Sequence, residues 1–323
     1  MRWLVTGGAG YIGAHVVATL AEGGHEVVVL DDLSTGLRER VVPGSRFVEG
    51  SVLDAAAVRS ALAGVDGVVH TAAKKQVGES VAQPLHYYRE NVGGLQVLLE
   101  ECVAAGVGRF VLSSSAAVYG EAEGETVHEG SRTVPSSPYG ETKLAGEWLV
   151  NACARAHGLS AVSLRYFNVA GAGAPELGDA GIFNLVPLVF EALEAGQRPQ
   201  VFGADYPTAD GTCVRDYVHV ADLARAHLLA ADALGEPGLA ATYNVGRGEG
   251  ASVLEVLGVV AEVTGRDTAY DVVPRRPGDP PRLVAEVDRI REDLGFVAEH
   301  PLPDMVASAW EAWQRRPGSR GGP

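Results

Sequence analysis

The sequence predicts an α/β fold built around a parallel sheet. Over the first half of the chain, short apolar runs alternate with stretches of helical periodicity. A glycine-rich turn also joins the first apolar run to the first helical stretch. Alternation of this kind is typical of βαβ units, whose helices cover both faces of the sheet. Together the two observations predict a doubly wound sheet of the Rossmann type.

The expected elements follow in chain order. Asp54 is suited to cap the start of the second helix, and Gly106 is suited to end the third. Buried strands are expected at residues 3–5, 26–30, 46–48, 67–70, 109–112 and 161–166, and helices at 11–22, 54–62, 84–105 and 139–157.

Composition limits the class of protein. The chain has 323 residues, of which 46% are apolar and 21% charged, as in ordinary globular enzymes. A net charge of −15 argues against a nucleic-acid surface, which needs a basic footprint. Cys102, Cys153 and Cys213 are odd in number and widely spaced, so neither disulfides nor a metal site are predicted. Since no apolar run approaches the ~20 residues of a membrane span and no signal peptide is recognisable, we expect a cytoplasmic protein that is not bound to a membrane.

The loop at residues 6–13 has the glycine spacing of a dinucleotide-binding turn. Gly7 can supply the tight turn, Gly10 lets the backbone approach a pyrophosphate, and Gly13 permits close packing of helix on strand. Asp31 ends the second strand, where a carboxylate binds both ribose hydroxyls and repels a 2′-phosphate. The sequence therefore predicts NAD rather than NADP as cofactor; a purely structural glycine turn is the alternative.

Tyr139 and Lys143 are the most informative polar pair in the chain. A spacing of four places both side chains on one helix face. A free tyrosine has a pKa of about 10 and is a poor base at neutral pH. A fixed ammonium one turn away favours the tyrosinate and lowers that pKa. The pair is predicted to transfer protons near pH 7, although the same spacing also occurs where Tyr packs and Lys is solvated.

Four further runs resemble one family. They are residues 112–120, with three serines before two alanines, 137–143, 164–168 and 210–220. With the glycine loop, they resemble UDP-glucose 4-epimerases of the extended short-chain dehydrogenase/reductase superfamily, from residue 1 to about residue 315. The glycine loop and the Tyr–Lys pair mark the superfamily, whereas the runs at 164–168 and 210–220 are more specific to the epimerases.

The resemblance implies a mechanism in which UDP-glucose and UDP-galactose interconvert through a transient 4-keto sugar. Tyr139 would take the proton of the sugar 4′-hydroxyl while hydride passes from C4′ to NAD and returns to the other face. Lys143 would lower the pKa of Tyr139 and hydrogen-bond the nicotinamide ribose. Ser115 would hold the 4′-oxygen and relay its proton. A buried serine that closes a strand is the alternative for Ser115.

The resemblance also implies the residues of both binding sites. Arg215 and Arg276 would neutralise the diphosphate, a task suited to the guanidinium fork, and a surface salt bridge is the alternative. Lys74 is expected to be solvated and His70 to belong to the core. The implied cofactor residues are Gly7, Gly10, Tyr11, Ile12, Gly13, Asp31, Asp32, Leu33, Ser34, Ser51, Val52, Thr71, Lys75, Asn91, Tyr139, Lys143 and Tyr166. The implied substrate residues are Ser115, Tyr139, Asn168, Asn184, Leu185, Gln200, Val201, Phe202, Arg215, Arg276, Asp279 and Leu283.

Some positions depart from the family pattern. Ser51 stands where an acidic residue often contacts adenine, Thr71 replaces a common aromatic, and Glu90 precedes Asn91 where some members have two asparagines. Leu283 aligns with a position that is a bulky Tyr in some members and small in others. A large side chain there excludes a 2-acetamido group, so we expect UDP-glucose and UDP-galactose as main substrates and leave the N-acetyl sugars open.

Other functions remain as alternatives. Sugar-nucleotide dehydratases and decarboxylases of this fold place carboxylates just after the serine or threonine, where this chain has Ala116 and Ala117. Alanine cannot take or donate a C5 proton, so elimination is disfavoured. The remaining alternatives are a 4-epimerase of another UDP-sugar (UDP-N-acetylglucosamine, UDP-glucuronate or UDP-xylose), a non-catalytic NAD-binding protein on the same fold, and a reductase that releases its reduced cofactor.

The chain is expected to form two lobes and to pair with a second copy. Residues 170–181 are rich in Gly, Ala and Pro and predict a loop, after which the elements are shorter. By resemblance, a homodimer would form through the helices near 84–105 and 139–157. We expect an NAD-binding Rossmann domain at residues 1–168 joined by parts of 214–245, a smaller mixed α/β UDP-sugar lobe at 169–316, and a disordered tail at 317–323.

Overall fold

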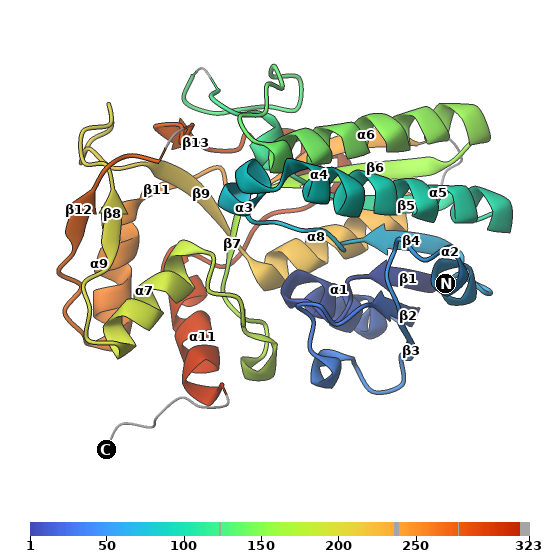
Figure 1. Ribbon diagram of the computed structural model, residues 1–323, viewed down its shortest axis with the longest axis horizontal. Helices are drawn as coiled ribbons and strands as arrows, with labels where there is room; N and C mark the ends of the chain where they lie inside the picture. Colours follow the sequence, from blue (N-terminus) through green and yellow to red (C-terminus); the bar gives the residue numbers. More distant parts are fainter. Residues whose placement is uncertain (123, 236–238, 277, 317–323) are drawn as a thin grey trace.

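A seven-stranded parallel sheet forms the centre of the molecule (Figure 1). The computed structural model describes residues 1–122, 124–235, 239–276 and 278–316. The strand order is β10-β6-β5-β4-β1-β2-β3 and every neighbouring pair is parallel, with the reversal of order between β1 and β4. This confirms the predicted doubly wound α/β fold of the Rossmann type. The strands are β1 (Arg2–Thr6), β2 (Glu26–Asp31), β3 (Arg46–Glu49), β4 (Gly67–His70), β5 (Arg109–Ser115), β6 (Ser160–Tyr166) and β10 (Ala240–Val245).

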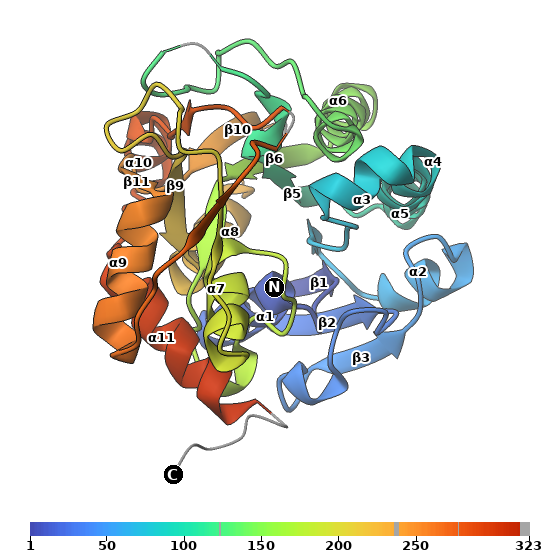
Figure 2. The same ribbon diagram turned by 60° about the vertical axis from the view of Figure 1, so that its left-hand side comes forward.

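Helices cover both faces of this sheet because each strand is apolar on both sides. On β1, Trp3 and Val5 point into one apolar core, shared with α1 (Tyr11–Glu22) and α8 (Val220–Ala233). Leu4 points into the opposite core, built with α2 (Ala55–Ala61), α5 (Gly94–Ala105) and α6 (Pro138–His157). Figure 2 shows these two helical layers on either side of the strands. The period of two along a strand produces this division.

The predicted helix ends are confirmed, but one predicted helix is wrong in its middle. Asp54 accepts hydrogen bonds from the first backbone amides of α2, and Gly106 ends α5 in the left-handed conformation at φ 71°. The expected helix at 84–105 divides into α4 (Pro84–Tyr87), a π-helical segment (Tyr88–Gly93) and α5, after a separate α3 (Val77–Ala82). The wider π turn places Asn91 inward, where its side chain is buried and bonds to the backbone of Lys74.

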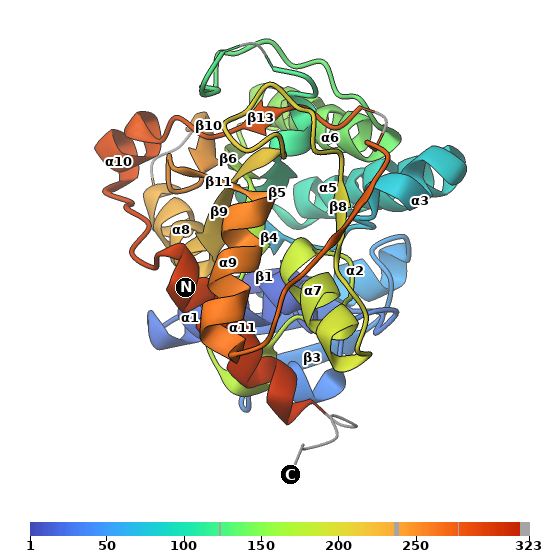
Figure 3. The same cartoon turned by 90° about the vertical axis from the view of Figure 1, so that its left-hand side faces the viewer.

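Most of the elements beyond β6 build a second, smaller layer (Figure 3). Here β9 (Val214–His219) pairs with β7 (Asn168–Ala170), β11 (Gly250–Ser252) and β13 (Arg282–Leu283), and β8 (Gln200–Phe202) pairs with β12 (Asp271–Val273). Helices α7 (Leu185–Glu194), α9 (Val253–Thr264) and α11 (Leu302–Arg315) enclose its core around Phe190, Met305 and Trp313. The remaining elements are the 3-10 turns η1 (Arg38–Arg40), η3 (Ala116–Val118) and η4 (Pro175–Leu177), and helix α10 (Asp288–Leu294).

The chain returns to the first sheet after entering the second layer. Of residues 214–245, α8 packs on α1 and β10 extends the seven-stranded sheet, whereas β9 lies in the second sheet. Ile290 of α10 also joins the core of the first sheet. The division into a cofactor lobe and a substrate lobe stays a proposal, and the expected tail at 317–323 lies outside the described residues. Over the described ranges, no helix has both the length and the apolar character needed to cross a bilayer.

Candidate active site

The glycine turn after β1 brings backbone atoms so close together that it leaves little room for side chains. Gly7 has φ 71°, a left-handed conformation that favours glycine. A Cβ on Gly13 would lie 2.0 Å from the carbonyl oxygen of Gly7, and one on Gly10 would lie 3.2 Å from the same atom. The turn therefore keeps the start of α1 open to a ligand. These features fit the pyrophosphate of a dinucleotide, which binds at a helix N-terminus.

Asp31 at the end of β2 is fixed before any ligand binds. Its two carboxylate oxygens accept hydrogen bonds from the backbone amides of Ala9 (2.9 Å) and Leu33 (2.8 Å). Burial raises the pKa of Asp31, and these two hydrogen bonds lower it. Each oxygen keeps a lone pair for a further donor. The arrangement fits the two hydroxyls of a ribose, as the sequence predicted.

Leu33 departs from the site predicted for it. Its backbone has φ 55°, so the chain turns sharply after Asp31 and returns through Ser34, whose amide donates to Asp32 (2.9 Å). Leu33 contributes its backbone amide to Asp31, while Asp32 and Ser34 line the pocket.

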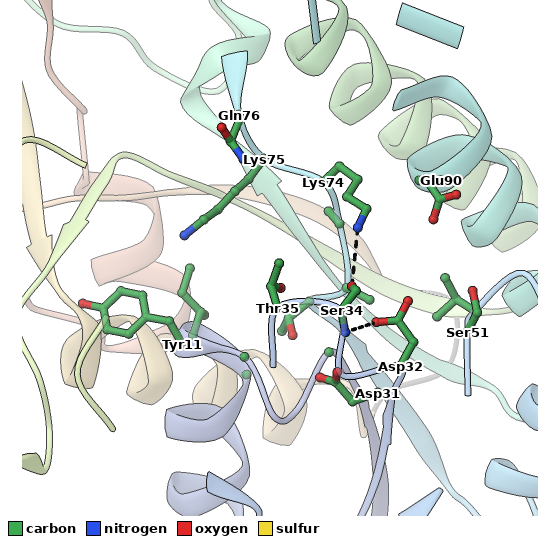
Figure 4. Close-up of a pocket in the computed structure, with 18 of the residues that line it drawn as sticks. Tyr11, Asp31, Asp32, Ser34, Thr35, Ser51, Lys74, Lys75, Gln76 and Glu90 are labelled. Atoms are coloured by element: carbon green, nitrogen blue, oxygen red, sulfur yellow. Dashed lines mark hydrogen bonds between the residues drawn. The ribbon is translucent and has the colours of Figure 1, made fainter. Parts of the chain in front are cut away.

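The opposite wall of the pocket comes from the segment after β4 (Figure 4). Lys75 extends toward Tyr11, with its Nζ 5.9 Å from the ring centre. Lys74, which is expected to be solvated, makes an exposed contact from its Nζ to the Oγ of Ser34 at 3.4 Å, and it lines the pocket as Lys75 does. Adjacent lysines on an irregular segment point to different sides of the chain, and spacing alone does not tell which faces the cavity.

Asn91 lies behind this wall. Its side-chain oxygen accepts from the amide of Lys74 (2.8 Å), and its side-chain nitrogen donates to the carbonyl of Lys74 and to Thr142 Oγ1 (3.0 Å each). Asn91 therefore fixes the wall to α6. This place suits a structural role, whereas the sequence predicted a cofactor contact.

One continuous pocket joins most of the residues predicted for the cofactor. It extends from the Asp31 end to Tyr139 and Lys143, and Tyr166 lies at that same end. Sequence reasoning missed several of its lining residues, including Thr35, Gln76, Glu79 and Phe183. The predicted residues that line it are Gly7, Gly10, Tyr11, Ile12, Gly13, Asp31, Asp32, Ser34, Ser51, Val52, Thr71, Lys75, Tyr139, Lys143 and Tyr166, and Glu90 lines it as well.

The positions that depart from the family pattern are well packed. Thr71 Oγ1 donates to the carbonyl of Thr6 (2.7 Å), so the hydroxyl ties β4 to β1 at the pocket. Ser51 Oγ accepts from the amide of Leu53 (3.1 Å) and keeps donor capacity toward the pocket. His70 next to Thr71 is buried, and burial lowers its pKa to about 3. It is a neutral core histidine, bonded to Thr6 (2.7 Å).

Tyr139 and Lys143 line the pocket, and Ser115 contacts Tyr139. Ser115 ends β5, accepts from the amide of Ala117 (3.2 Å) and hydrogen-bonds Tyr139. Lys143 Nζ donates to the carbonyl of Ser113 (2.8 Å) and lies 5.9 Å from the ring centre of Tyr139. All three side chains are buried. The arrangement can hold a proton at the Tyr139 oxygen and pass it through the Ser115 hydroxyl.

Burial dominates the charge states of this group. It raises the pKa of Tyr139, and the hydrogen bond from Ser115 lowers it. It lowers the pKa of Lys143 to about 8, while the carboxylate of Glu147 raises it. The sequence predicted a lowered pKa for Tyr139, so in the protein alone the expected direction is wrong. Desolvation disfavours the charged form of each group, and here it is the largest influence on both pKa values.

The predicted diphosphate residues lie on β9 and in the segment that precedes β13. Arg215 is largely buried and its Nη2 donates to Asp279 (2.6 Å). The guanidinium of Arg276 stacks 3.8 Å above the ring of Phe202 on β8. Such stacking holds a cation in place while its N–H groups stay available. Four residues predicted to bind substrate thus lie in two contacting pairs.

The other predicted substrate residues surround this cluster. Asn168 begins β7 and hydrogen-bonds Tyr217, and Asn184, which precedes Leu185 at the start of α7, donates to Asp179 (2.9 Å). On β8, Gln200 is exposed and Val201 is buried in the core of the second layer, so Val201 is placed to support Phe202 rather than to meet a ligand.

Leu283 links the substrate cluster to the proton-transfer site. It is half-buried, pairs with Arg215 in the sheet register, and packs against the cluster that contains Ala116 and Phe167. A change of side-chain size at this position therefore acts on the surroundings of both Ser115 and Arg215.

Residues 3–246 match the sequence model of the NAD dependent epimerase/dehydratase family. The chain belongs to this family. Over 321 residues it is 46% identical to a UDP-glucose 4-epimerase from Azospirillum brasilense, with 97% of this chain and 92% of that relative covered. This confirms the resemblance stated from the motifs, and NAD as the cofactor.

Two solved structures show the same architecture. UDP-glucose 4-epimerase from Brucella ovis in complex with NAD is 41% identical, with a TM-score of 0.92 and coverage of 95% of this chain and 97% of that chain. UDP-glucose-4-epimerase from Stenotrophomonas maltophila, with bound NAD and formylated UDP-arabinopyranose, is 40% identical, with a TM-score of 0.92 and 98% of both chains covered. Both solved relatives contain NAD, the cofactor that fits the pocket described above.

Gly13→Ala is expected to abolish NAD retention in a folded protein. The new Cβ would lie 2.0 Å from the Gly7 carbonyl, so the turn must shift where the pyrophosphate approaches. We expect at least a roughly tenfold weaker Kd for NAD by calorimetry, with circular dichroism unchanged. Gly258→Ala in α9, where a Cβ meets nothing within 4 Å, is the matched control. Equal NAD affinity in both variants would contradict this assignment.

Proposed function

We propose that this protein is an NAD-dependent 4-epimerase that interconverts UDP-glucose and UDP-galactose. One observation carries the proposal. Tyr139 and Lys143 line the NAD pocket, Ser115 hydrogen-bonds Tyr139, and the two residues after Ser115 are Ala116 and Ala117. A dehydratase needs an acid or base for C5 beside the serine, and alanine provides neither. The site is thus suited to proton transfer at one sugar oxygen.

Bound NAD would supply reversible acceptance of a hydride from C4′ of the sugar. Tyr139 takes the proton of the 4′-hydroxyl, and Ser115, oriented by the amide of Ala117, holds the 4′-oxygen and relays the proton. Lys143, whose Nζ donates to the Ser113 carbonyl, would stabilise the tyrosinate and help to hold the nicotinamide ribose. Burial of this group excludes water, which would otherwise compete for the proton and release the sugar intermediate.

The substrate is proposed to lie between the lobes, with its diphosphate at Arg215 and Arg276. Arg215 exchanges part of its contact with Asp279 for phosphate oxygens, because a guanidinium fork matches both partners. Asn168, Leu185 and Phe202 surround the nucleotide, and Leu283 borders the sugar. Other UDP-sugars stay open as substrates, and the Stenotrophomonas relative in complex with a UDP-pentose derivative supports that breadth.

We also propose a homodimer that forms through one helical face. Exposed apolar side chains gather on α3, α4 and α6, and Figures 1 and 2 show these helices side by side. Leu85 is 85% exposed and Trp148 65% exposed, which is unusual for large apolar side chains without a partner. A second copy would cover this face.

The free thiols of Cys102, Cys153 and Cys213 support a reducing, cytoplasmic location.

Tyr139→Phe is expected to abolish turnover while NAD stays bound. The variant keeps the ring and its packing but loses the oxygen that takes the proton, so kcat for UDP-galactose should fall by about 10³-fold or more. Release of UDP-glucose and the amount of co-purified NAD are the measurements. Tyr270→Phe on the surface is the control. A near-normal kcat in Tyr139→Phe would show that another group takes the proton, and a wild-type protein that converts no UDP-galactose would refute the proposed function.

Leu283→Ala is expected to shift specificity toward N-acetylated sugars. Removing the branched side chain opens space near Ala116, where a 2-acetamido group needs room. The ratio of kcat/KM for UDP-N-acetylgalactosamine to that for UDP-galactose should rise about tenfold, and Leu283→Tyr should lower it. Val297→Ala, at an exposed position, is the control and should leave the ratio unchanged. An unchanged ratio in Leu283→Ala would place the specificity determinant elsewhere.

Leu85→Glu is expected to dissociate the proposed dimer. A charge at the centre of a buried apolar interface lacks a partner there. Light scattering should give twice the 33.7 kDa chain mass for the wild type and the single mass for the variant. Val272→Glu, on an exposed strand away from this face, is the control. A wild-type protein of single mass would rule out the dimer.

A further inference from the structure

The helix face that carries Tyr139 and Lys143 continues one turn further to Glu147. Residues four apart on a helix lie above one another, so the three side chains form a row along α6. Glu147 is only 3% exposed, which is rare for a glutamate. It has no role in the chemistry proposed above. A buried carboxylate next to a functional lysine needs an explanation.

Three consecutive serines at the end of β5 hold this row. Ser115 hydrogen-bonds Tyr139, and the carbonyl of Ser113 accepts from Lys143 (2.8 Å). Between them, Ser114 Oγ donates to Glu147 Oε1 (2.5 Å). Each member of the row therefore contacts a different residue of one strand end. The register of α6 on β5 and the position of Glu147 are fixed together.

Arg165 on β6 fixes the carboxylate from the other side. It is paired with Ser114 in the sheet register. Its Nε donates to Glu147 Oε1 (2.9 Å) and its Nη2 to Oε2 (2.6 Å), while Nη1 bonds Tyr119 (3.0 Å). This is a bidentate, charge-assisted pair with its other donors also occupied. The Glu147 side chain cannot change rotamer without leaving Arg165 unpaired.

Burial of such an ion pair costs free energy unless its charges interact favourably with other groups. Burying two ions is often less favourable than burying apolar side chains of the same shape. Lys143 Nζ donates to the neutral carbonyl of Ser113. The charge of Lys143 acts on buried His70 of β4, Tyr166 of β6 lines the same pocket as Lys143, and Arg165 of β6 pairs with Glu147. His70 is neutral and Arg165 is a cation, so neither can stabilise a second cation. Glu147 is the carboxylate whose charge acts on Lys143.

We propose that Glu147 is a positioning residue of the proton-transfer site. Held by Arg165 and Ser114, its carboxylate supplies the counter-charge that keeps the Lys143 ammonium buried beside Tyr139. The inference rests on the roles proposed above for Tyr139 and Lys143. It adds that the pair YxxxK is one part of a longer row, whose third member sets the charge of the second.

Lysine NMR tests this directly, because the chain has three lysines, Lys74, Lys75 and Lys143. In holoenzyme labelled with ¹³C-lysine, Lys143→Arg assigns the Lys143 Cε signal, and a pH titration then gives the midpoint without any turnover. The wild-type signal should be that of a charged amine at pH 7. A neutral amine at pH 7 would overturn the proposal without any Glu147 variant.

Glu147→Gln should lower the Lys143 midpoint by about one pH unit, since an opposite charge is lost nearby. The pH profile of kcat should narrow from both sides. Its alkaline limb should move to lower pH because Lys143 loses its proton earlier. Its acidic limb should move to higher pH because a less fully charged Lys143 stabilises the tyrosinate less, which raises the pKa of Tyr139. At pH 7 kcat should fall about tenfold with KM little changed. A purely structural role would lower the Tm and leave midpoint and limbs in place, which would overturn the proposal.

Glu147→Gln leaves Arg165 buried without its partner and could unfold the protein. The double variant Glu147→Gln/Arg165→Met removes both charges, and the Lys143 midpoint should still fall because the lost carboxylate is the charge that acts on Lys143. Glu101→Gln is the control: it breaks a bidentate pair of the same type with Arg59 on the outer helices, and should change neither midpoint nor kcat. A wild-type midpoint in the double variant would refute the inference. Failure of the proposed function would appear separately, as a wild-type protein that converts no UDP-galactose, and failure of the Tyr139 assignment as turnover retained in Tyr139→Phe.

Discussion

The packing of α6 against the carboxyl end of β5 is the constraint on which the rest of the site depends. β5 is a central strand, buried on both faces and hydrogen-bonded to β4 and β6, so its end cannot move independently of the sheet. Gly140, where a Cβ would lie 2.6 Å from the carbonyl of Ala117, lets the first turn of α6 approach that end closely. The Ser115–Tyr139 contact follows from this approach. A loop could not hold two proton-transfer groups with the same precision.

Burial disfavours the charged states of these side chains, and it also strengthens the interactions on which their chemistry depends. It opposes charge on Tyr139 and on Lys143, so neither is in its reactive state simply because it is close to the other. The same exclusion of water strengthens every remaining electrostatic interaction. The hydroxyl of Ser115 and the carboxylate of Glu147, which lies one turn from Lys143, therefore have electrostatic effects that water would screen at a surface. The site has few polar groups, and each has a defined partner.

Local spacing was enough to predict much of this. The glycine loop, Asp31 and the Tyr–Lys pair each lie within one turn or one strand end, where a short motif determines geometry. The sequence could not show the π turn that brings Asn91 behind the wall, because that turn depends on packing against α6. It could not tell Lys74 from Lys75, since their segment has no regular period. The direction of the Tyr139 pKa shift was wrong because burial depends on the whole fold.

The position of Arg165 shows why such sites are found only in part from motifs. Arg165 belongs to a run that resembled the epimerases as a string of residues, and its partner Glu147 lies eighteen positions earlier on another element. The sheet register, which sets Ser114 beside Arg165, brings them together.

A similar long-range contact joins helix α1 to the loop between β7 and Asn184. Tyr11 donates to the carbonyl of Gly171 (2.6 Å), and His15 accepts from the amide of Gly173 (2.8 Å). Burial lowers the pKa of His15 to about 4, so the ring stays neutral and keeps that acceptor at neutral pH. The loop that leads to Asn184 is thus hydrogen-bonded to α1, whose N-terminus faces the cofactor pocket, so one helix supports both predicted ligand sites.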